Sequence, residues 1–295
     1  MRVRFSLRPP KIMNLDNFSS LIELFAYQAD KQNKKSIFLF FFNPNNKISY
    51  TWDETEKNIV NLSKTIKENI KEGDRCLLVS ENRPEWFVSD LAIMVAGGIT
   101  VPAYTTYTER DYEYIIDDCT PAIIIVSDNA QYKKVKNIIP KKSFIKKVIF
   151  FESIDHNSSD YELHLNDILK DKEYEEKNFL DLKIERKSAA CIIYTSGTQG
   201  NPKGVILSHG GILNNCEGSY NLLKSIISNK TKFLTWLPLS HSYEHTVQFV
   251  QIAVGAKIFY AESIDKLLKN MSECSPDIMT AVPRFYQNLY QKINS

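Results

Sequence analysis

The chain has 295 residues, which is enough for more than one average domain and for a large buried core. Its 37 basic and 35 acidic residues give a formal net charge of +2, so bulk electrostatics provide no case for nucleic-acid binding. The hydrophobic content of 43% is ordinary for a globular protein rather than a disordered one.

The five cysteines are widely spaced and include no CxxC pair, which argues against a disulfide framework and against a zinc site. This cysteine usage fits a reducing compartment. The first ten residues are basic but contain no apolar core of signal-peptide length, and no apolar run is long enough to span a membrane. We therefore expect a cytoplasmic protein, with residues 1–13 as an N-terminal extension.

The first predicted elements are a helix, a hairpin and a second helix. Apolar residues at helical spacing predict a helix over 17–32. The aromatic-rich segments 36–42 and 47–50 flank an Asn-Pro-Asn-Asn turn, which is typical of a β-hairpin. Thr51, with Glu54 three residues later, predicts a capping box at the start of the next helix.

Strands and helices then alternate. A strand over 75–80 precedes a helix over 84–96, for which Asn82 and Glu85 are the start signal, and a strand over 98–102 follows. The alternation continues with a helix from Thr108 to Cys119, a strand at 122–126, a helix at 128–139 and a strand at 147–151. Such alternation predicts a parallel sheet covered on both faces, with ligands at the carboxyl ends of its strands.

Residues 156–185 are polar and charge-rich, and we interpret them as a surface connection that ends the first subdomain. The expected division is a first α/β subdomain at 14–185 and a partial second α/β subdomain at 186–295. The second half is expected to contain strands at 189–194, 232–237, 257–260 and 278–281, and helices that begin near Ser208, Ile264 and Pro283.

A loop at 195–204, with the sequence TSGTQGNPKG, follows the strand that ends at Tyr194. Its glycines let backbone N–H groups converge on an anion, and its hydroxyls and lysine add donors and charge. The composition predicts phosphate binding, although a flexible surface turn could also contain three glycines. The Walker A pattern is excluded because Lys203 is followed by Gly204 rather than by serine or threonine, and GxGxxG is absent.

This loop resembles the TSGTTGxPKG signature of adenylate-forming enzymes, the superfamily of acyl-CoA synthetases, luciferases and peptide-synthetase adenylation domains. The one departure is Gln199, where the family usually has threonine. Further segments resemble those of long-chain fatty acyl-CoA synthetases: ENRPEW at 81–86, GITVPAY at 98–104, LPLSHSYE at 237–244 and VPR at 282–284. The resemblance covers about residues 50–293.

The resemblance implies an α/β fold, the N-terminal domain of an adenylate-forming enzyme with two parallel-sheet subdomains flanked by helices. It also implies ATP-dependent activation of a fatty acid to an acyl-adenylate, followed by transfer to coenzyme A. The implied small-molecule partners are therefore ATP with Mg²⁺, a fatty acid and coenzyme A. A fatty substrate would allow peripheral membrane contact, although no amphipathic basic helix requires it.

The resemblance assigns the following residues to the β- and γ-phosphates of ATP: Thr195, Ser196, Gly197, Thr198, Gln199, Gly200 and Lys203. The hydroxyl of Thr198 would also bind Mg²⁺. The alternative for Lys203 is a plain surface cation.

His241 would lie at the carboxylate of the substrate, by the same resemblance, and the alternative is a structural histidine. Glu244 and His245 are weaker candidates. Three aromatic residues could line an acyl tunnel or belong to the core: Trp236, Tyr243 and Phe249.

In the family, the adenine-binding segment, the ribose-binding aspartate, the hinge and the lysine of the C-terminal lid domain all follow the region matched here. We therefore expect an N-terminal fragment of a longer enzyme, or a truncated product without the lid domain, that is inactive by itself. The alternatives are a non-catalytic nucleotide- or acyl-binding remnant and another adenylation domain. The long-chain-type segments weigh against a peptide-synthetase domain.

Overall fold

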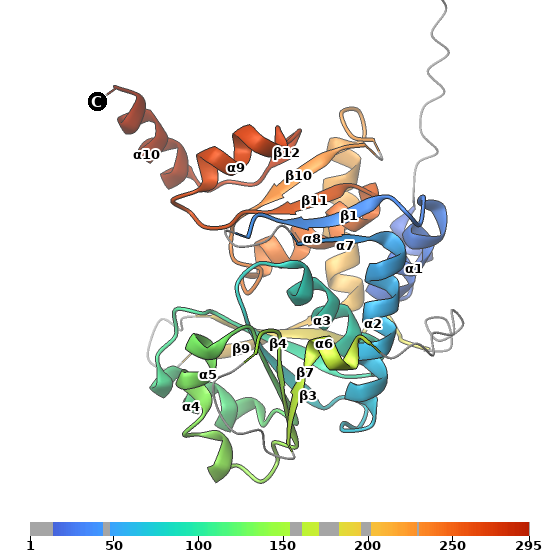
Figure 1. The fold of residues 1–295 in the computed structure, drawn as a ribbon. Helices are drawn as coiled ribbons and strands as arrows, with labels where there is room; N and C mark the ends of the chain where they lie inside the picture. Colours follow the sequence, from blue (N-terminus) through green and yellow to red (C-terminus); the bar gives the residue numbers. More distant parts are fainter. Residues whose placement is uncertain are drawn as a thin grey trace, which may run out of the picture.

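The computed structural model describes residues 14–43, 48–153, 161–170, 183–195, 202–228 and 230–294, and its strands form two sheets (Figure 1). The strands of the larger sheet are β3 (Arg75–Val79), β4 (Ile99–Ala103), β5 (Ile123–Val126), β6 (Lys147–Phe150), β7 (Glu162–His164), β8 (Ala189–Thr195) and β9 (Lys203–Ser208). Those of the smaller sheet are β1 (Ile37–Phe41), β2 (Ile48–Thr51), β10 (Lys232–Thr235), β11 (Lys257–Tyr260) and β12 (Ile278–Met279).

The larger sheet has the order β7-β6-β5-β3-β4-β8-β9, and the smaller has the order β12-β10-β11-β1-β2. Neighbouring strands are parallel except in two hairpins, β1 with β2 and β8 with β9. The predicted parallel sheet and the first hairpin are therefore confirmed. The predicted α/β architecture is also observed.

Two strands differ from expectation. The predicted loop ends at Gly204 and the predicted helix begins near Ser208, but residues 203–208 pair with β8 as the edge strand β9. The segment 156–185 was read as a surface connection, but within it β7 extends the sheet beside β6. Both strands are at edges, where half-exposed residues give a weak alternation of apolar and polar side chains.

The strand order also crosses the predicted boundary at residue 185. Strands β8 and β9 follow that boundary but join the sheet of β3 to β7, whereas β1 and β2 precede it and join the sheet of β10 to β12. Each sheet is therefore assembled from both parts of the sequence, and the division into subdomains stays a prediction.

Helices cover the sheets: α1 (Leu21–Lys31), α2 (Trp52–Lys67), α3 (Pro84–Val95), α4 (Glu109–Cys119), α5 (Asn129–Val135), α6 (Leu165–Ile168), α7 (His209–Leu223), α8 (Ser242–Val254), α9 (Leu267–Cys274) and α10 (Pro283–Asn294). Thr51 and Thr108 each form a capping box with the residue at the third helical position. Each box satisfies backbone N–H groups that a helix start leaves unpaired. None of the described helices is long and apolar enough to cross a membrane.

Alternate residues of the central strand β3 face opposite layers. Cys76 and Leu78 belong to the cluster of buried side chains that includes α2 and α3, whereas Leu77 and Val79 pack in the cluster that includes Tyr112 of α4. A strand with apolar residues on both sides is expected in a parallel sheet with helices on both faces.

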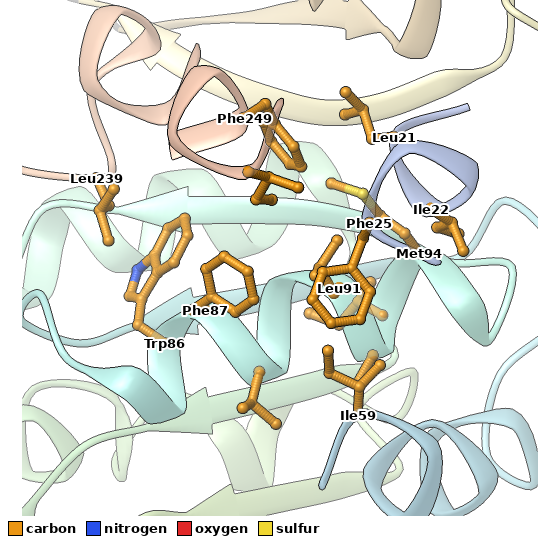
Figure 2. Close-up of a cluster of buried hydrophobic side chains, with 14 of the residues drawn as sticks. Leu21, Ile22, Phe25, Ile59, Trp86, Phe87, Leu91, Met94, Leu239 and Phe249 are labelled. Carbon is orange, nitrogen blue, oxygen red and sulfur yellow. The ribbon is translucent and has the colours of Figure 1, made fainter. Parts of the chain in front are cut away.

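Helix α3 lies between the two sheets and is buried over all 12 of its residues. Figure 2 shows Trp86, Phe87 and Leu91 of this helix among side chains from other elements, including Phe25 of α1 and Phe249 of α8. A mostly apolar helix that is buried on every side requires partners on every side. The main core therefore continues from one sheet to the other through α3.

The start of α3 differs from the prediction. Its N-cap residue is Arg83, which makes no side-chain cap, and Asn82 does not cap the helix. The Asn82 side chain instead donates to the carbonyl of Leu237 at 2.6 Å and accepts from the N–H of Leu239 at 2.9 Å. Because these leucines follow β10 of the smaller sheet, Asn82 links the two sheets beyond the ends of their strands.

Replacing Asn82 with alanine should lower the free energy of unfolding by about 1 to 3 kcal/mol, because one carbonyl and one N–H lose their partner. Urea unfolding followed by circular dichroism measures the change. Asn215→Ala is the matched control, because Asn215 is exposed and its side chain bonds only to a carbonyl of its own helix. Equal effects of the two substitutions would contradict the link.

Candidate functional site

A cavity of about 320 Å³ lies where carboxyl ends of parallel strands from the two sheets meet. Its lining comes from the segments that follow four strands: Ser80 to Asn82 after β3, Tyr104 to Thr106 after β4, Trp236, Pro238 and Ser240 after β10, and Ala261 to Ile264 after β11. Ligands of parallel α/β sheets bind at this end of the strands. The cavity is therefore a candidate site.

The predicted phosphate loop is carried by the hairpin of β8 and β9. Thr195, the last residue of β8, is paired with Lys203, the first residue of β9. Both side chains are exposed, and the ammonium of Lys203 has no hydrogen-bond or ion-pair partner among the described residues. Directly opposed residues of antiparallel strands project to the same face, so a cation and a hydroxyl stand together at the mouth of the loop.

The rest of the predicted loop lies outside the described residues: Ser196, Gly197, Thr198, Gln199 and Gly200. Their proposed phosphate contacts, and the magnesium contact of Thr198, stay predictions. The donor set at the two described ends, a lysine and a threonine, fits an anionic ligand.

His241 is the N-cap of α8, and its Nδ1 atom accepts a hydrogen bond from the N–H of Tyr243 at 3.2 Å. The ring is exposed, and its Nε2 atom has no partner among the described residues. The helix start thus fixes the imidazole while one ring nitrogen stays available. Ser240, the residue that precedes His241 in the chain, lines the candidate cavity.

Glu244, in the first turn of α8, is 1% exposed. Burial raises the pKa of its carboxyl to about 7, although a hydrogen bond from the hydroxyl of Thr280 opposes the shift. Loss of water is costly for the charged form, so the buried acid holds its proton to a higher pH. Glu244 therefore ties the start of α8 to the segment that follows β12.

His245 is fully buried and its Nε2 atom lies 2.8 Å from the carboxylate of Asp90 on α3. Burial by itself would lower the pKa of this imidazole, but the Asp90 carboxylate raises it to about 10. The short contact between His245 and Asp90 therefore forms a buried polar link between α8 and the central helix. Removing one partner of such a pair typically costs 3 to 5 kcal/mol, so the pair fixes the position of α8.

Sequence reasoning ranked His245 low and missed Asp90. The signal that could have found Asp90 is one charged residue in the otherwise uncharged stretch 86–95. A charge in a fully buried helix requires a partner, but the sequence does not say which.

The three aromatic residues proposed for an acyl tunnel lie in different environments. Phe249 is fully buried in the main core, and Tyr243 is 53% exposed. Trp236 borders a second cavity, of about 560 Å³, together with Leu267 and Phe285. The structure therefore places Phe249 in the core and Trp236 beside a mostly apolar hollow.

The described residues contain no group of three or more histidine, cysteine, aspartate or glutamate side chains that could hold a metal ion.

Glu244→Gln should reduce the pH dependence of stability between pH 4.5 and 7. In wild type the folded carboxyl has a pKa of about 7 instead of the ordinary 4.5, so the folded state holds more protons and stability falls as the pH rises through this range. The variant should lose on the order of 3 kcal/mol less over the same range, from a shift of about 2.5 pKa units.

Urea unfolding at several pH values measures this difference, and Glu273→Gln on the exposed surface of α9 is the control. A variant curve parallel to that of wild type would show that Glu244 is ionised in the folded protein at pH 5.

The similarity to known proteins extends over nearly the whole chain. Residues 25–294 match the family model described as AMP-binding enzyme. Long chain acyl-CoA synthetase 3 from Arabidopsis thaliana is 28% identical over 251 residues, which is 81% of this chain and 38% of that protein. The chain thus spans about two fifths of the length of this relative.

Solved structures agree on the fold. The N-terminal domain of FACL13 from Mycobacterium tuberculosis, in an inhibitor-bound crystal structure, has a TM-score of 0.78 at 17% identity and covers 93% of this chain and 65% of that chain. The anthranilate CoA ligase AuaEII in complex with anthranoyl-AMP has a TM-score of 0.76 at 17% identity, with 90% and 51% covered. The match of the family model over residues 25–294 establishes that the chain belongs to the AMP-binding enzyme family.

Proposed function

We propose that this chain is the N-terminal part of an ATP-dependent ligase that converts a fatty acid to its coenzyme A thioester through an acyl-adenylate. Support comes from the AMP-binding family and from relatives named long chain acyl-CoA synthetases. The observation that carries the proposal is the exposed pair of Thr195 and Lys203 at the mouth of the loop. A solved relative holds anthranoyl-AMP, which is an acyl-adenylate.

The physical problem of the first step is that both reactants are negatively charged. A carboxylate oxygen must attack the α-phosphorus of ATP, and the bond to the β-phosphate must break so that pyrophosphate leaves. Donors and cations around the triphosphate reduce the repulsion and stabilise the leaving group. In this proposal the β- and γ-phosphates are held by Thr195, Ser196, Gly197, Thr198, Gln199, Gly200 and Lys203, and Thr198 also binds Mg²⁺.

His241 is proposed to hold the substrate carboxylate. Its available Nε2 atom can donate a hydrogen bond to a carboxylate oxygen, and its Nδ1 atom is already fixed by the N–H of Tyr243. In the second step the thiol of coenzyme A would attack the acyl carbon, lose its proton and release AMP.

The proposal includes a cytoplasmic site of action, which agrees with five buried cysteines that form no disulfide.

A second candidate function is nucleotide or acyl binding without catalysis. The two candidates share the loop and differ in turnover, so separate measurements of binding and of exchange distinguish them.

Lys203→Met should weaken the binding of inorganic pyrophosphate by about 10- to 100-fold, because one charge-assisted hydrogen bond of about 1.5 to 3 kcal/mol is lost. Isothermal titration calorimetry with pyrophosphate and with ATP measures the effect. Lys203→Arg should retain part of the affinity. Lys187→Met is the control, because Lys187 is an exposed cation that precedes the opposite end of β8. Similar losses in both methionine variants would point to general charge and reject the loop.

The 295-residue chain should show little or no exchange of labelled pyrophosphate into ATP in the presence of palmitate. The resemblance places the adenine, ribose and lysine contacts outside the matched region, so bound phosphates alone would leave the α-phosphorus poorly positioned. Robust exchange would overturn this expectation and favour a complete active site in the chain.

A further inference from the structure

We propose that Asp118, acting through Tyr194 and Gly204, is a positioning residue that holds the two stems of the phosphate loop at a fixed separation. The inference rests on the proposed function for its consequence in ligand binding. The contact itself is formed by described residues on three elements: α4, β8 and β9.

The first observation is the hydrogen bond from the Tyr194 hydroxyl to a carboxylate oxygen of Asp118, at 2.5 Å. Tyr194 is 3% exposed and lies one residue before the loop. Burial raises the pKa of its phenol, and the hydrogen bond to Asp118 adds to the shift, so the hydroxyl stays a donor at any physiological pH.

The second observation is the position of Asp118 in the last turn of α4, which contains no basic residue. A carboxylate at this end of a helix faces the negative end of the helix dipole, which is unfavourable. The hydrogen bond from Tyr194 offsets part of this cost, and nothing in the helix itself requires an acid there.

The third observation concerns Gly204, which lies directly opposite Tyr194 in the hairpin. A Cβ atom at Gly204 would lie 2.9 Å from Cγ2 of Ile192 and 3.2 Å from Cζ of Tyr194. The tyrosine ring therefore occupies the space that a side chain at 204 would need, and it can cover the neighbouring strand only because that residue is glycine.

These contacts act on the loop through the next pair of residues. Thr195 and Lys203 follow Tyr194 and precede Gly204, and they are the last pair of the ladder before the loop. A ring held by Asp118 on one side and by the backbone of Gly204 on the other limits how far this pair can separate. The ends of the loop are therefore placed before a ligand binds, which lowers the ordering cost of binding.

Three substitutions test the contact. Tyr194→Phe removes the hydroxyl and Asp118→Ala removes the acceptor, whereas Asp118→Asn keeps an oxygen that can accept. We expect about fivefold weaker pyrophosphate binding for the first two, the effect of one lost hydrogen bond, and near-wild-type binding for Asp118→Asn. The double variant Tyr194→Phe/Asp118→Ala should be no weaker than either single variant, because both remove the same bond.

Two matched controls separate this contact from general effects. Asp117→Ala removes the neighbouring acid, which is paired with Lys142 and not with Tyr194. Gly218→Ala adds a methyl group with no atom within 4 Å, whereas Gly204→Ala should displace the tyrosine ring and weaken binding at least as much as Tyr194→Phe. All affinities are compared under conditions in which every variant is folded, so a purely stabilising role would leave them unchanged.

Hydrogen exchange of the amides at Thr195 and Lys203, without ligand, gives a readout that does not depend on the proposed function. Faster exchange in Tyr194→Phe and Asp118→Ala, and not in Asp117→Ala, supports the positioning role. If wild type then fails to bind pyrophosphate, the proposed function is wrong while the contact remains. If exchange and affinity in Asp118→Ala equal those in Asp117→Ala, the positioning role is overturned.

Discussion

The burial of α3 on all sides is the constraint on which the arrangement of the two sheets depends. Each of its 12 residues is buried, so any separation of the sheets would expose a mostly apolar helix to water. At about 25 cal/mol per Å² of apolar surface, the free-energy cost of exposing even one large side chain such as Trp86 is a large part of the free energy of unfolding of a domain. The two sheets therefore keep a fixed position relative to each other.

Because the burial of α3 already holds the two sheets together, a few polar contacts are enough to fix their relative position. Asn82 at the start of α3 bonds to the segment after β10, and Asp90 in the middle of α3 pairs with His245 of α8. The Asp90–His245 contact is fully buried and the Asn82 contact partly so, and an unmade bond is costly where water is excluded. They set the register of α8 and thereby the place of His241 at its start.

Local signals predicted local structure well, and contacts between distant segments could not be predicted from them. Thr51 was recognised as a capping residue because its partner Glu54 is three residues away. Asn82 has the residue type of a cap, yet its partners are more than 150 positions away, and no spacing rule identifies them. The hairpin partner β9 was missed because its apolar residues are partly exposed, as with Ile206 at 65%. The candidate site shows the same difference between local and distant signals. The loop could be predicted from its composition, whereas the pairing of Asp90 with His245 could not.

Charge divides the candidate site into two regions. The described lining of the 320 Å³ cavity includes the carboxylates of Glu81 and Glu262 and contains no lysine or arginine. The exposed cation at the loop is Lys203, on β9 at the edge of the larger sheet. The two carboxylates would repel a polyphosphate in the cavity, whereas the ammonium of Lys203 would attract it to the hairpin, because like charges repel and unlike charges attract. Under the proposed function the β- and γ-phosphates would therefore bind at the loop, and the contacts that hold the ends of the loop would contribute to the affinity by placing them before binding.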